Sequence, residues 1–273
     1  MQDNDLMPHV ESSPAPWDLK AESRNETVSV PGQFNDIDTT LSQTTTEEGA
    51  FRGGMGFVMI VRYTDSPVGP YDELMMVPGD FKNPSGTQRP RISRIFVSTL
   101  ASVYNGRRNW NIPKELANFT FTSNPNDHRI TEMRVFAATS YSPVTYATKP
   151  FFAVNIKSVM WPFPAIPMNL KYSPVSMTLV QPPLDAAQDS SRPWLIGTSE
   201  WNMFTLVDYK GRVKPVRWEG AIEDDDAVSR RRTRGKMANG KEFPDVTPYR
   251  VGIFWQDVTM KFLEGTVPGL PHM

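Results

Sequence analysis

Residues 104–119 read YNGRRNWNIPKELANF and place one lysine, Lys114, directly after a proline and among apolar neighbours. An acidic turn, SPVGPYDEL at residues 66–74, lies roughly forty positions earlier in the chain. A neutral lysine amine can attack a ketone to form an iminium, which accepts electrons when a neighbouring carbon–carbon bond breaks. Burial favours the neutral amine, because it removes the water that stabilises the ammonium. This stretch therefore makes Lys114 the first candidate for a catalytic residue.

Outward from this stretch, short apolar and β-branched runs alternate with clusters of Pro, Gly and Asn. Such runs are typical of β-strands. We expect strands at residues 56–63, 73–77, 91–104, 128–138, 150–161, 174–181, 200–209 and 250–262. The 25 prolines of the chain argue against long helices. The one short helix that we expect is PKELANF at residues 113–119, because Pro113 suits a first helical turn.

This pattern predicts a mainly β protein with minor α content. A closed or partly closed β-barrel is the favoured architecture, since closure removes exposed strand edges. The first fifty residues are rich in Ser, Thr, Asp, Glu and Pro, so we expect an irregular N-terminal arm over residues 1–50. The remainder, residues 51–273, is expected to form a single domain, because no linker or internal repeat divides it.

The composition excludes several classes of partner and chemistry. With 29 basic and 30 acidic residues, the formal net charge is −1, so no general field attracts nucleic acid or anionic lipid. The absence of cysteine excludes disulfides and thiolate metal sites. No apolar run approaches the ~18 residues that span a bilayer, and the acidic opening lacks the features of a signal peptide. We expect a soluble cytoplasmic protein with no nucleic-acid or membrane partner.

Other familiar functional motifs are missing from the sequence. The three histidines are scattered and match no metal-site spacing, so no metal is expected. The glycines of GAFRGGMGF, residues 49–57, precede a strand and not a helix, which argues against a phosphate-binding loop. The segment EDDDAVSRRRTRGK, residues 223–236, is an acidic block followed by a basic one. We interpret it as a solvated loop in preference to a nucleic-acid patch, because its opposite charges neutralise each other at short range.

Three stretches together resemble acetoacetate decarboxylase and its superfamily, and the fungal branch fits best. They are SPVGPYDE at residues 66–73, NGR at residues 105–107 and WNIPK at residues 110–114. The similarity spans about residues 50–160. The resemblance implies a cone-shaped closed β-barrel, a lysine inside a largely apolar cavity, assembly into a homo-oligomer, and no cofactor.

The resemblance also implies roles for individual residues. Lys114 corresponds to the Schiff-base lysine and Glu73 to the active-site glutamate, while Tyr71, Arg107 and Trp110 are candidates for substrate binding. Each has a simpler structural alternative. Glu73 could cap a turn or pair with Arg107, and buried aromatic residues most often serve packing. Arg107 could equally be the structural partner of a carboxylate.

Two features depart from the family pattern. The decarboxylase has a second lysine after its nucleophile, where this chain has Glu115. Because successive side chains of a helix diverge by about 100°, we expect Glu115 to face away from Lys114. The decarboxylase also uses an N-terminal arginine near the substrate carboxylate, for which Arg24, Arg52 and Arg62 are the candidates here.

Three functions remain open from the sequence. The favoured one is a cofactor-free lyase of fungal specialised metabolism, acting on a keto acid or a larger apolar carbonyl compound through an iminium at Lys114. Decarboxylation, aldol chemistry and dehydration all use that intermediate. The second is an isomerase or cyclase that holds a bulky natural-product intermediate in a shaped pocket without forming an imine. The third is a protein that binds a lipophilic ligand.

Overall fold

The computed structural model describes residues 10–21, 27–32, 49–159, 164–173, 176–187, 192–222, 235–246 and 248–269. Within these ranges the protein is mainly β, with one α-helix, α1 (Leu100–Trp110), and a short 3-10 helix, η3 (Leu170–Tyr172). The strands are β1 (Trp17–Ala21), β2 (Thr27–Gly32), β3 (Phe51–Gly53), β4 (Gly56–Tyr63), β5 (Tyr71–Val77), β6 (Asp80–Lys82), β7 (Gln88–Pro90), β8 (Arg94–Val97), β9 (Lys114–Ser123), β10 (Ile130–Tyr141), β11 (Val144–Tyr146), β12 (Phe152–Ser158), β13 (Ile166–Asn169), β14 (Thr178–Gln181), β15 (Asn202–Gly220) and β16 (Val251–Phe262).

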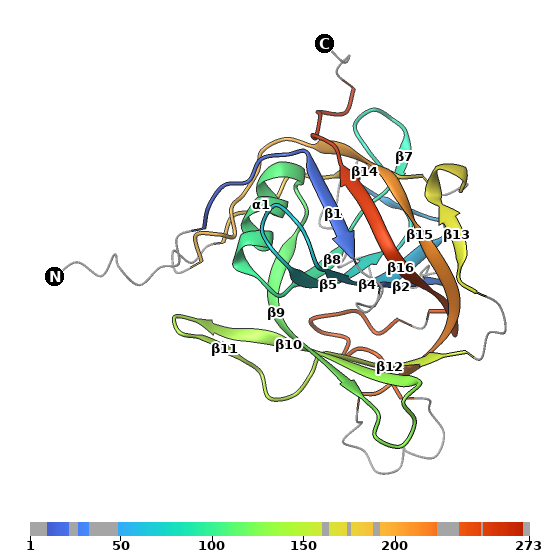
Figure 1. Ribbon diagram of the computed structural model, residues 1–273. Coiled ribbons are helices and arrows are strands. Elements are labelled where there is room, and N and C mark those ends of the chain that lie inside the picture. Colours follow the sequence, from blue (N-terminus) through green and yellow to red (C-terminus); the bar gives the residue numbers. More distant parts are fainter. Residues whose placement is uncertain are drawn as a thin grey trace.

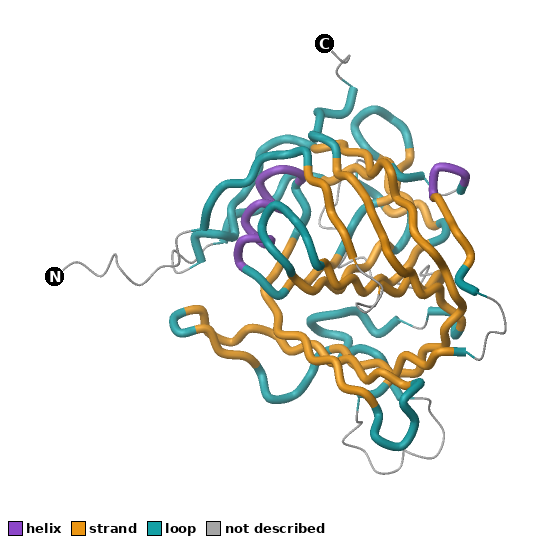
Figure 2. The backbone as a smooth tube through the Cα atoms, viewed as in Figure 1, coloured by secondary structure: helices purple, strands orange, loops and turns teal. Residues whose placement is uncertain are grey.

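Most strands belong to one 13-stranded sheet, whose order is β1-β16-β2-β4-β5-β8-β9-β10-β12-β15-β13. β15 pairs with β12 and also with β16, and β16 in turn pairs with β2. β3, β6 and β7 form a separate small sheet. Figure 1 shows how strongly the large sheet curves, with α1 beside the start of β9 and the β10–β11 hairpin projecting outward. Figure 2 shows loop segments that run between the upper and lower strands of the sheet.

The region around Lys114 differs from the expected strand and helix. The strand expected over residues 91–104 ends at Val97, and the chain then enters α1. Thr99 caps this helix by accepting a hydrogen bond from the backbone N–H of Ser102, which satisfies an otherwise unpaired donor. The helix expected over residues 113–119 is wrong, because this segment is the start of β9.

The reason lies in how α1 ends. Asn111 adopts a left-handed conformation with φ of 54°, and its N–H bonds back to the carbonyl of Arg107. Pro113 therefore follows a finished helix and does not begin a new one. Lys114 then pairs in parallel with Ile95 of β8. Parallel neighbours need a crossover connection, which α1 supplies.

The N-terminal arm contains two strands where we expected irregular structure. β1 pairs antiparallel with β16, and β2 lies between β16 and β4. Trp17, Leu19 and Ala21 alternate as buried residues along β1, and this period of two anchors the strand on the sheet. Pairing with β16 thus makes this segment a strand, although its composition is polar.

Residues just before β1 fasten α1 from outside. The side chain of Asn105 accepts from the N–H of Ser13 at 2.7 Å and donates to the carbonyl of Glu11 at 2.9 Å. Asn109 donates to the carbonyl of Ser13 at 2.8 Å. We call residues 11–13 the N-terminal strap. It ties the helix to a chain segment more than ninety positions away.

Two apolar clusters fill the molecule. The lysine-side cluster packs against the face of β4, β5 and β9 that carries Lys114, and includes Trp17, Met59, Val61, Tyr63, Tyr71, Met75, Ile95, Val103, Trp110, Leu116, Tyr209, Trp255, Val258, Met260 and Phe262. The second cluster covers the opposite face and includes Val58, Ile60, Leu74, Met76, Phe96, Met133, Val135, Phe151, Phe152, Trp218 and Phe243. Apolar burial on both faces explains why residues 74–77 form a continuous apolar run.

The other strands and loops expected from the sequence can be compared with the structure where it describes them. Strands expected at residues 56–63, 73–77, 128–138 and 250–262 are confirmed with small shifts of their ends. The solvated loop expected at residues 223–236 lies outside the described residues up to position 234. Within the described ranges, no helix has the length and apolar character needed to cross a membrane.

Candidate active site

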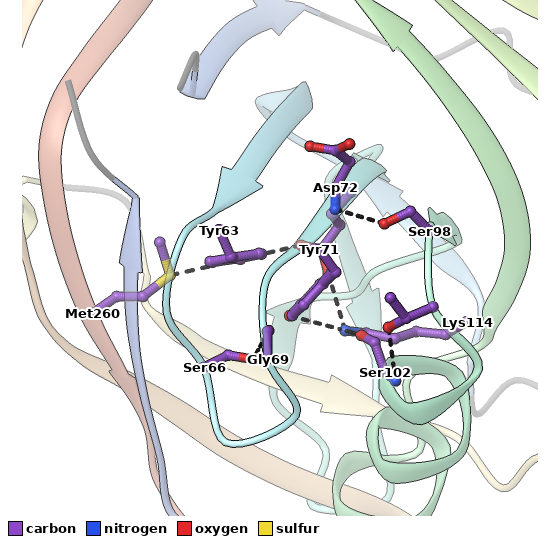
Figure 3. Close-up of polar contacts among 11 residues, drawn as sticks. Tyr63, Ser66, Gly69, Tyr71, Asp72, Ser98, Ser102, Lys114 and Met260 are labelled. Carbon is purple, nitrogen blue, oxygen red and sulfur yellow. Dashed lines mark hydrogen bonds and ion pairs between the residues drawn. The ribbon is translucent and has the colours of Figure 1, made fainter. Parts of the chain in front are cut away.

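Lys114 is the first residue of β9, and its side chain points into the molecule. It is only 4% exposed. Its Nζ lies 3.0 Å from Oε2 of Glu73, 2.9 Å from Oγ of Ser102 and 3.5 Å from the hydroxyl of Tyr71. Figure 3 shows Tyr71, Ser102 and Lys114 converging from a strand, a helix and a second strand. Each of the three ammonium hydrogens can therefore meet an oxygen acceptor.

Glu73 and Tyr71 occupy the same face of β5, because side chains two positions apart point the same way. Glu73 is 2% exposed, and its Oε1 accepts from the hydroxyl of Tyr63 at 3.2 Å. Tyr63 lies opposite Tyr71 on the neighbouring strand β4, and their ring centroids are 4.6 Å apart. Both oxygens of the buried carboxylate therefore have partners, one cationic and one phenolic.

One face of α1 closes over the lysine side chain. Ser102 and Gly106 are four positions apart, so they lie on the same face of the helix. A Cβ built on Gly106 would sit 2.6 Å from Cδ of Lys114 and 2.8 Å from its Cε. Only a residue without a side chain allows the lysine to extend past the helix toward Glu73. The missing side chain of Gly106 thus leaves the space that the Lys114 methylenes occupy.

The electrostatics of the site are those of a buried ion pair among neutral donors. Burial, reinforced by the negative charge of Glu73, raises the pKa of Tyr63 and that of Tyr71 well above 10. Both phenols therefore stay protonated at neutral pH and act as hydrogen-bond donors or acceptors without adding charge. Removing either Glu73 or Lys114 would leave the other charge buried and uncompensated, which is strongly destabilising.

The other two expected site residues make hydrogen bonds away from the Glu73–Lys114 pair. The guanidinium of Arg107 donates to the carbonyl of Ile196 at 2.9 Å and to the carbonyl of Asp185 at 2.7 Å. These contacts fasten a loop to α1. The indole of Trp110 donates to the carbonyl of Leu263 at 2.7 Å. The described contacts of both side chains are structural, whereas Tyr71, Glu73 and Lys114 meet as expected.

The residues that depart from the family pattern can also be placed. Glu115 is exposed, on the face of β9 opposite Lys114, because adjacent strand residues alternate. It faces away as expected, although the reason is a strand and not a helix. Arg62 pairs with Asp72 at 2.9 Å on the face of β4 and β5 that does not carry Glu73. Arg52 is exposed on β3, and Arg24 lies outside the described residues.

Sequence reasoning missed three residues of the site. They are Ser102, Tyr63 and Gly106, the last of which lies against the lysine side chain. Ser102 and Gly106 were hidden by the incorrect strand over residues 91–104. The sequence did contain evidence for the helix and its face: Thr99 is a good helix cap, and Gly106 follows Ser102 by four positions, which places the two on one side of a helix. Tyr63 could have been found from its place at the end of the 56–63 strand, which pairs with residues 71–77.

The site offers oxygen and nitrogen groups but no cluster of metal ligands. Across the described part of the chain, no group of three or more His, Cys, Asp or Glu side chains could hold a metal ion. What the arrangement can do is exchange a proton between Glu73 and Lys114 over 3.0 Å, in surroundings that exclude bulk water.

Comparisons with known proteins give a fold but not a family. No family model matches the chain. A stretch of 73 residues is 33% identical to the protein NEOXANTHIN-DEFICIENT 1 of Oryza sativa subsp. japonica, which is 27% of this chain and 24% of that protein. The match thus spans about a quarter of the length of this curated relative.

Solved structures match over nearly the whole chain. Acetoacetate decarboxylase from Legionella pneumophila superposes with a TM-score of 0.57 at 14% identity, covering 97% of this chain and 92% of that one. A second acetoacetate decarboxylase structure gives a TM-score of 0.59 at 11% identity, with 98% of each chain covered. The protein therefore has an acetoacetate decarboxylase-like fold. At these identities the similarity extends to the fold alone.

Proposed function

We propose that this protein is a cofactor-free lyase in which Lys114 forms an iminium with a keto acid or a larger apolar carbonyl compound. The observation that carries the proposal is the position of its Nζ, buried and 3.0 Å from a carboxylate that can take its proton. The fold supports it, because a lyase is known on this architecture. The successive pairings of β15, β16 and β2 support our further proposal that the sheet closes into a cone-shaped barrel.

The proposed reaction begins with proton transfer from the ammonium of Lys114 to Glu73. The neutral amine then attacks the carbonyl carbon, and the carbonyl oxygen leaves as water, which takes one proton from the amine nitrogen and one from Glu73. In a β-keto acid, the bond to the carboxylate breaks and its electron pair moves into the iminium, which releases carbon dioxide and leaves an enamine. The enamine carbon takes up a proton, and water then hydrolyses the iminium to free the ketone and the lysine.

Neighbouring groups have defined parts in this scheme. Ser102 and Tyr71 hold the nitrogen in place as it changes from ammonium to amine. Tyr63 holds the far oxygen of Glu73, which keeps the near oxygen aimed at the nitrogen. Such positioning contributes to catalysis by keeping the reacting atoms within reach of each other. The fungal setting, the cytoplasmic location and the homo-oligomer remain parts of the proposal that depend on the sequence alone.

Reductive trapping tests the proposal directly. The protein is incubated with acetoacetate or with longer β-keto acids and cyanoborohydride, and the digested peptides are analysed by mass spectrometry. We expect an adduct on Lys114 and none on Lys241, an exposed lysine in the same digest. Lys114→Ala should lose both adduct and turnover. Turnover that survives in Lys114→Ala, with no adduct in the wild type, would reject the lyase.

The contacts of the Lys114 nitrogen also favour a second candidate function. The carboxylate beside Lys114 and the two hydroxyl oxygens around it also favour the charged ammonium, which cannot attack a carbonyl. In that case the site would be an isomerase or cyclase, with the ammonium donating a hydrogen bond to the substrate. Lys114→Arg separates the two, because an arginine retains the positive charge but forms no imine. Activity retained in Lys114→Arg would support the isomerase or cyclase.

A further inference from the structure

Two buried groups of the lysine-side cluster lack good hydrogen-bond partners. Trp255 on β16 is 3% exposed, and its indole Nε1 has no partner among the residues that the structure describes. Tyr209 on β15 is also 3% exposed, and its hydroxyl donates to the sulfur of Met59 at 4.0 Å. A thioether is a weak acceptor. Buried donors left in this condition are uncommon in proteins, and each calls for an explanation.

Two other indoles of the same cluster have backbone partners, whereas that of Trp194, like that of Trp255, has none among the described residues. Trp17 donates to the carbonyl of Ser13 at 3.1 Å, and Trp110 donates to the carbonyl of Leu263 at 2.7 Å. These tryptophans pack the core and find backbone partners, as buried indoles usually do. Trp255 sits in the same kind of environment without one. Since no described residue accepts from it, its N–H is available to an acceptor on a bound ligand.

The backbone aims Tyr209 and Trp255 at the same region. Their rings meet edge to face, with centroids 5.0 Å apart. The pairing of β15 with β16 shifts register on both sides of Lys210, next to Tyr209. Asp208, next to Tyr209, and Asp257, two positions after Trp255, adopt left-handed conformations with φ of 55° and 52°. Irregular pairings of this kind reorient side chains and are common next to functional sites.

These donors face the interior that also holds the ion pair. The hydroxyl of Tyr209 reaches Met59 on β4, and β4 pairs with β5, the strand that carries Glu73. Burial, with a smaller contribution from the charge of Glu73, raises the pKa of Tyr209. The phenol thus stays protonated and remains a donor at neutral pH. Neither ring carries a charge.

We infer that Tyr209 and Trp255 form a second, donor-only subsite that binds an uncharged acceptor oxygen of the substrate, at a distance from the carbonyl that reacts at Lys114. The inference builds on the proposed function and narrows its substrate class. The substrate is a carbonyl compound with an apolar body and a remote ether, ester, epoxide or second carbonyl oxygen. A remote carboxylate does not fit, because burying a charge beside two neutral donors costs far more than burying a neutral oxygen.

Paired probes test this subsite. Long-chain methyl ketones of increasing length are compared with analogues in which a methoxy group replaces the terminal ethyl group. Dissociation constants are measured by calorimetry without reductant, so that binding is read independently of imine formation. We expect the wild-type protein to prefer the methoxy probe of one chain length by about tenfold for each donor engaged. Tyr209→Phe and Trp255→Phe should each lose about tenfold of that preference.

The melting temperature of the ligand-free protein distinguishes binding from a structural role. Tyr209→Phe removes a donor that has only a weak partner, so the melting temperature should stay the same or rise. Trp255→Phe also leaves a cavity, so it should lower the melting temperature, but by less than a Trp→Phe change that loses a hydrogen bond as well. Trp17→Phe is the matched control. It removes an indole that donates to a carbonyl at 3.1 Å, so it should lower the melting temperature and keep the probe preference.

Two results would overturn the inference. One is the absence of any methoxy preference across the wild-type series. The other is a fall in melting temperature for Tyr209→Phe and Trp255→Phe like that of Trp17→Phe, with the preference intact. Reductive trapping of the same probes is scored separately. A methoxy preference without a Lys114 adduct supports the subsite and counts against the lyase, whereas an adduct without the preference does the reverse.

Discussion

Replacing Gly106 with alanine should separate stability from function in this protein. The new methyl group would lie 2.6 Å from Cδ and 2.8 Å from Cε of Lys114. Unstrained carbon atoms approach to about 3.5–4.0 Å, so the lysine methylenes must move by about 1 Å. Lys114 has little freedom to do so, because Glu73 and Ser102 hold its nitrogen at 3.0 and 2.9 Å.

The expected magnitudes follow from opposing effects. Alanine in place of glycine inside a helix stabilises it by roughly 0.5–1 kcal/mol. Crowding of a packed core costs about 1–3 kcal/mol. The free energy of unfolding should therefore fall by no more than about 2.5 kcal/mol. A displacement of about 1 Å at a reacting atom, however, lowers a rate by about a hundredfold.

Two measurements on Gly106→Ala check this reasoning. Urea denaturation gives the free energy of unfolding, and the rate of reductive trapping at Lys114 gives the reactivity of the amine. The control introduces the same alanine into a Glu73→Gln, Lys114→Ala background, where the crowded methylenes are absent and the helix should gain stability. Trapping at the wild-type rate in Gly106→Ala would refute the steric argument.

Further predictions concern the cap, the ion pair and the tyrosines. Thr99→Ala removes the helix cap and should lower the free energy of unfolding by about 0.5–2 kcal/mol in urea titrations, whereas an unchanged value would show that the cap is dispensable. Glu73→Gln and Lys114→Met should each cost about 3–5 kcal/mol, because each strands a buried charge. The double variant should cost less than the sum, and strict additivity in the double-mutant cycle would contradict the buried pair. The raised pKa of Tyr209 means that the folded state keeps a proton which the unfolded chain loses above pH ~10. The protonated Tyr209 therefore contributes its full stability below pH ~10, and the free energy of unfolding declines above that pH by about 1.4 kcal/mol per pH unit. In urea titrations, Tyr209→Phe should reduce this decline in the free energy of unfolding, whereas Tyr172→Phe, at an exposed position, should not.

Much of the β framework could be predicted from the sequence, because most strands obey local rules. The run at residues 56–63 is bounded by glycine and a polar turn, and β4 occupies those same residues. β1 carries a clean alternation at Trp17, Leu19 and Ala21, but so short a signal in a polar segment gains its meaning only from pairing with β16. Partners distant in sequence leave no trace in a local pattern.

The candidate site was predictable in part for a similar reason. The resemblance brought Lys114, Glu73 and Tyr71 together, since its motifs include all three. Ser102 was not predicted as a site residue, because the β-branched residues before it favour a strand. The cap at Thr99 instead begins a helix at this point. Arg107 lies inside a motif of the resemblance, yet its donors are used on the carbonyls of Asp185 and Ile196. Sequence proximity to a reactive lysine does not determine where a long side chain finds its partners.

The N-terminal strap couples distant parts of the chain to the lysine. Glu11 and Ser13 bond to Asn105 and Asn109, and the neighbouring turn of the same helix touches the Lys114 methylenes. A proteolytic cut or an affinity tag placed within residues 11–13 would therefore loosen the wall around the amine without altering any residue that contacts it. Recombinant versions that differ only there could report different reactivities for an identical set of site residues.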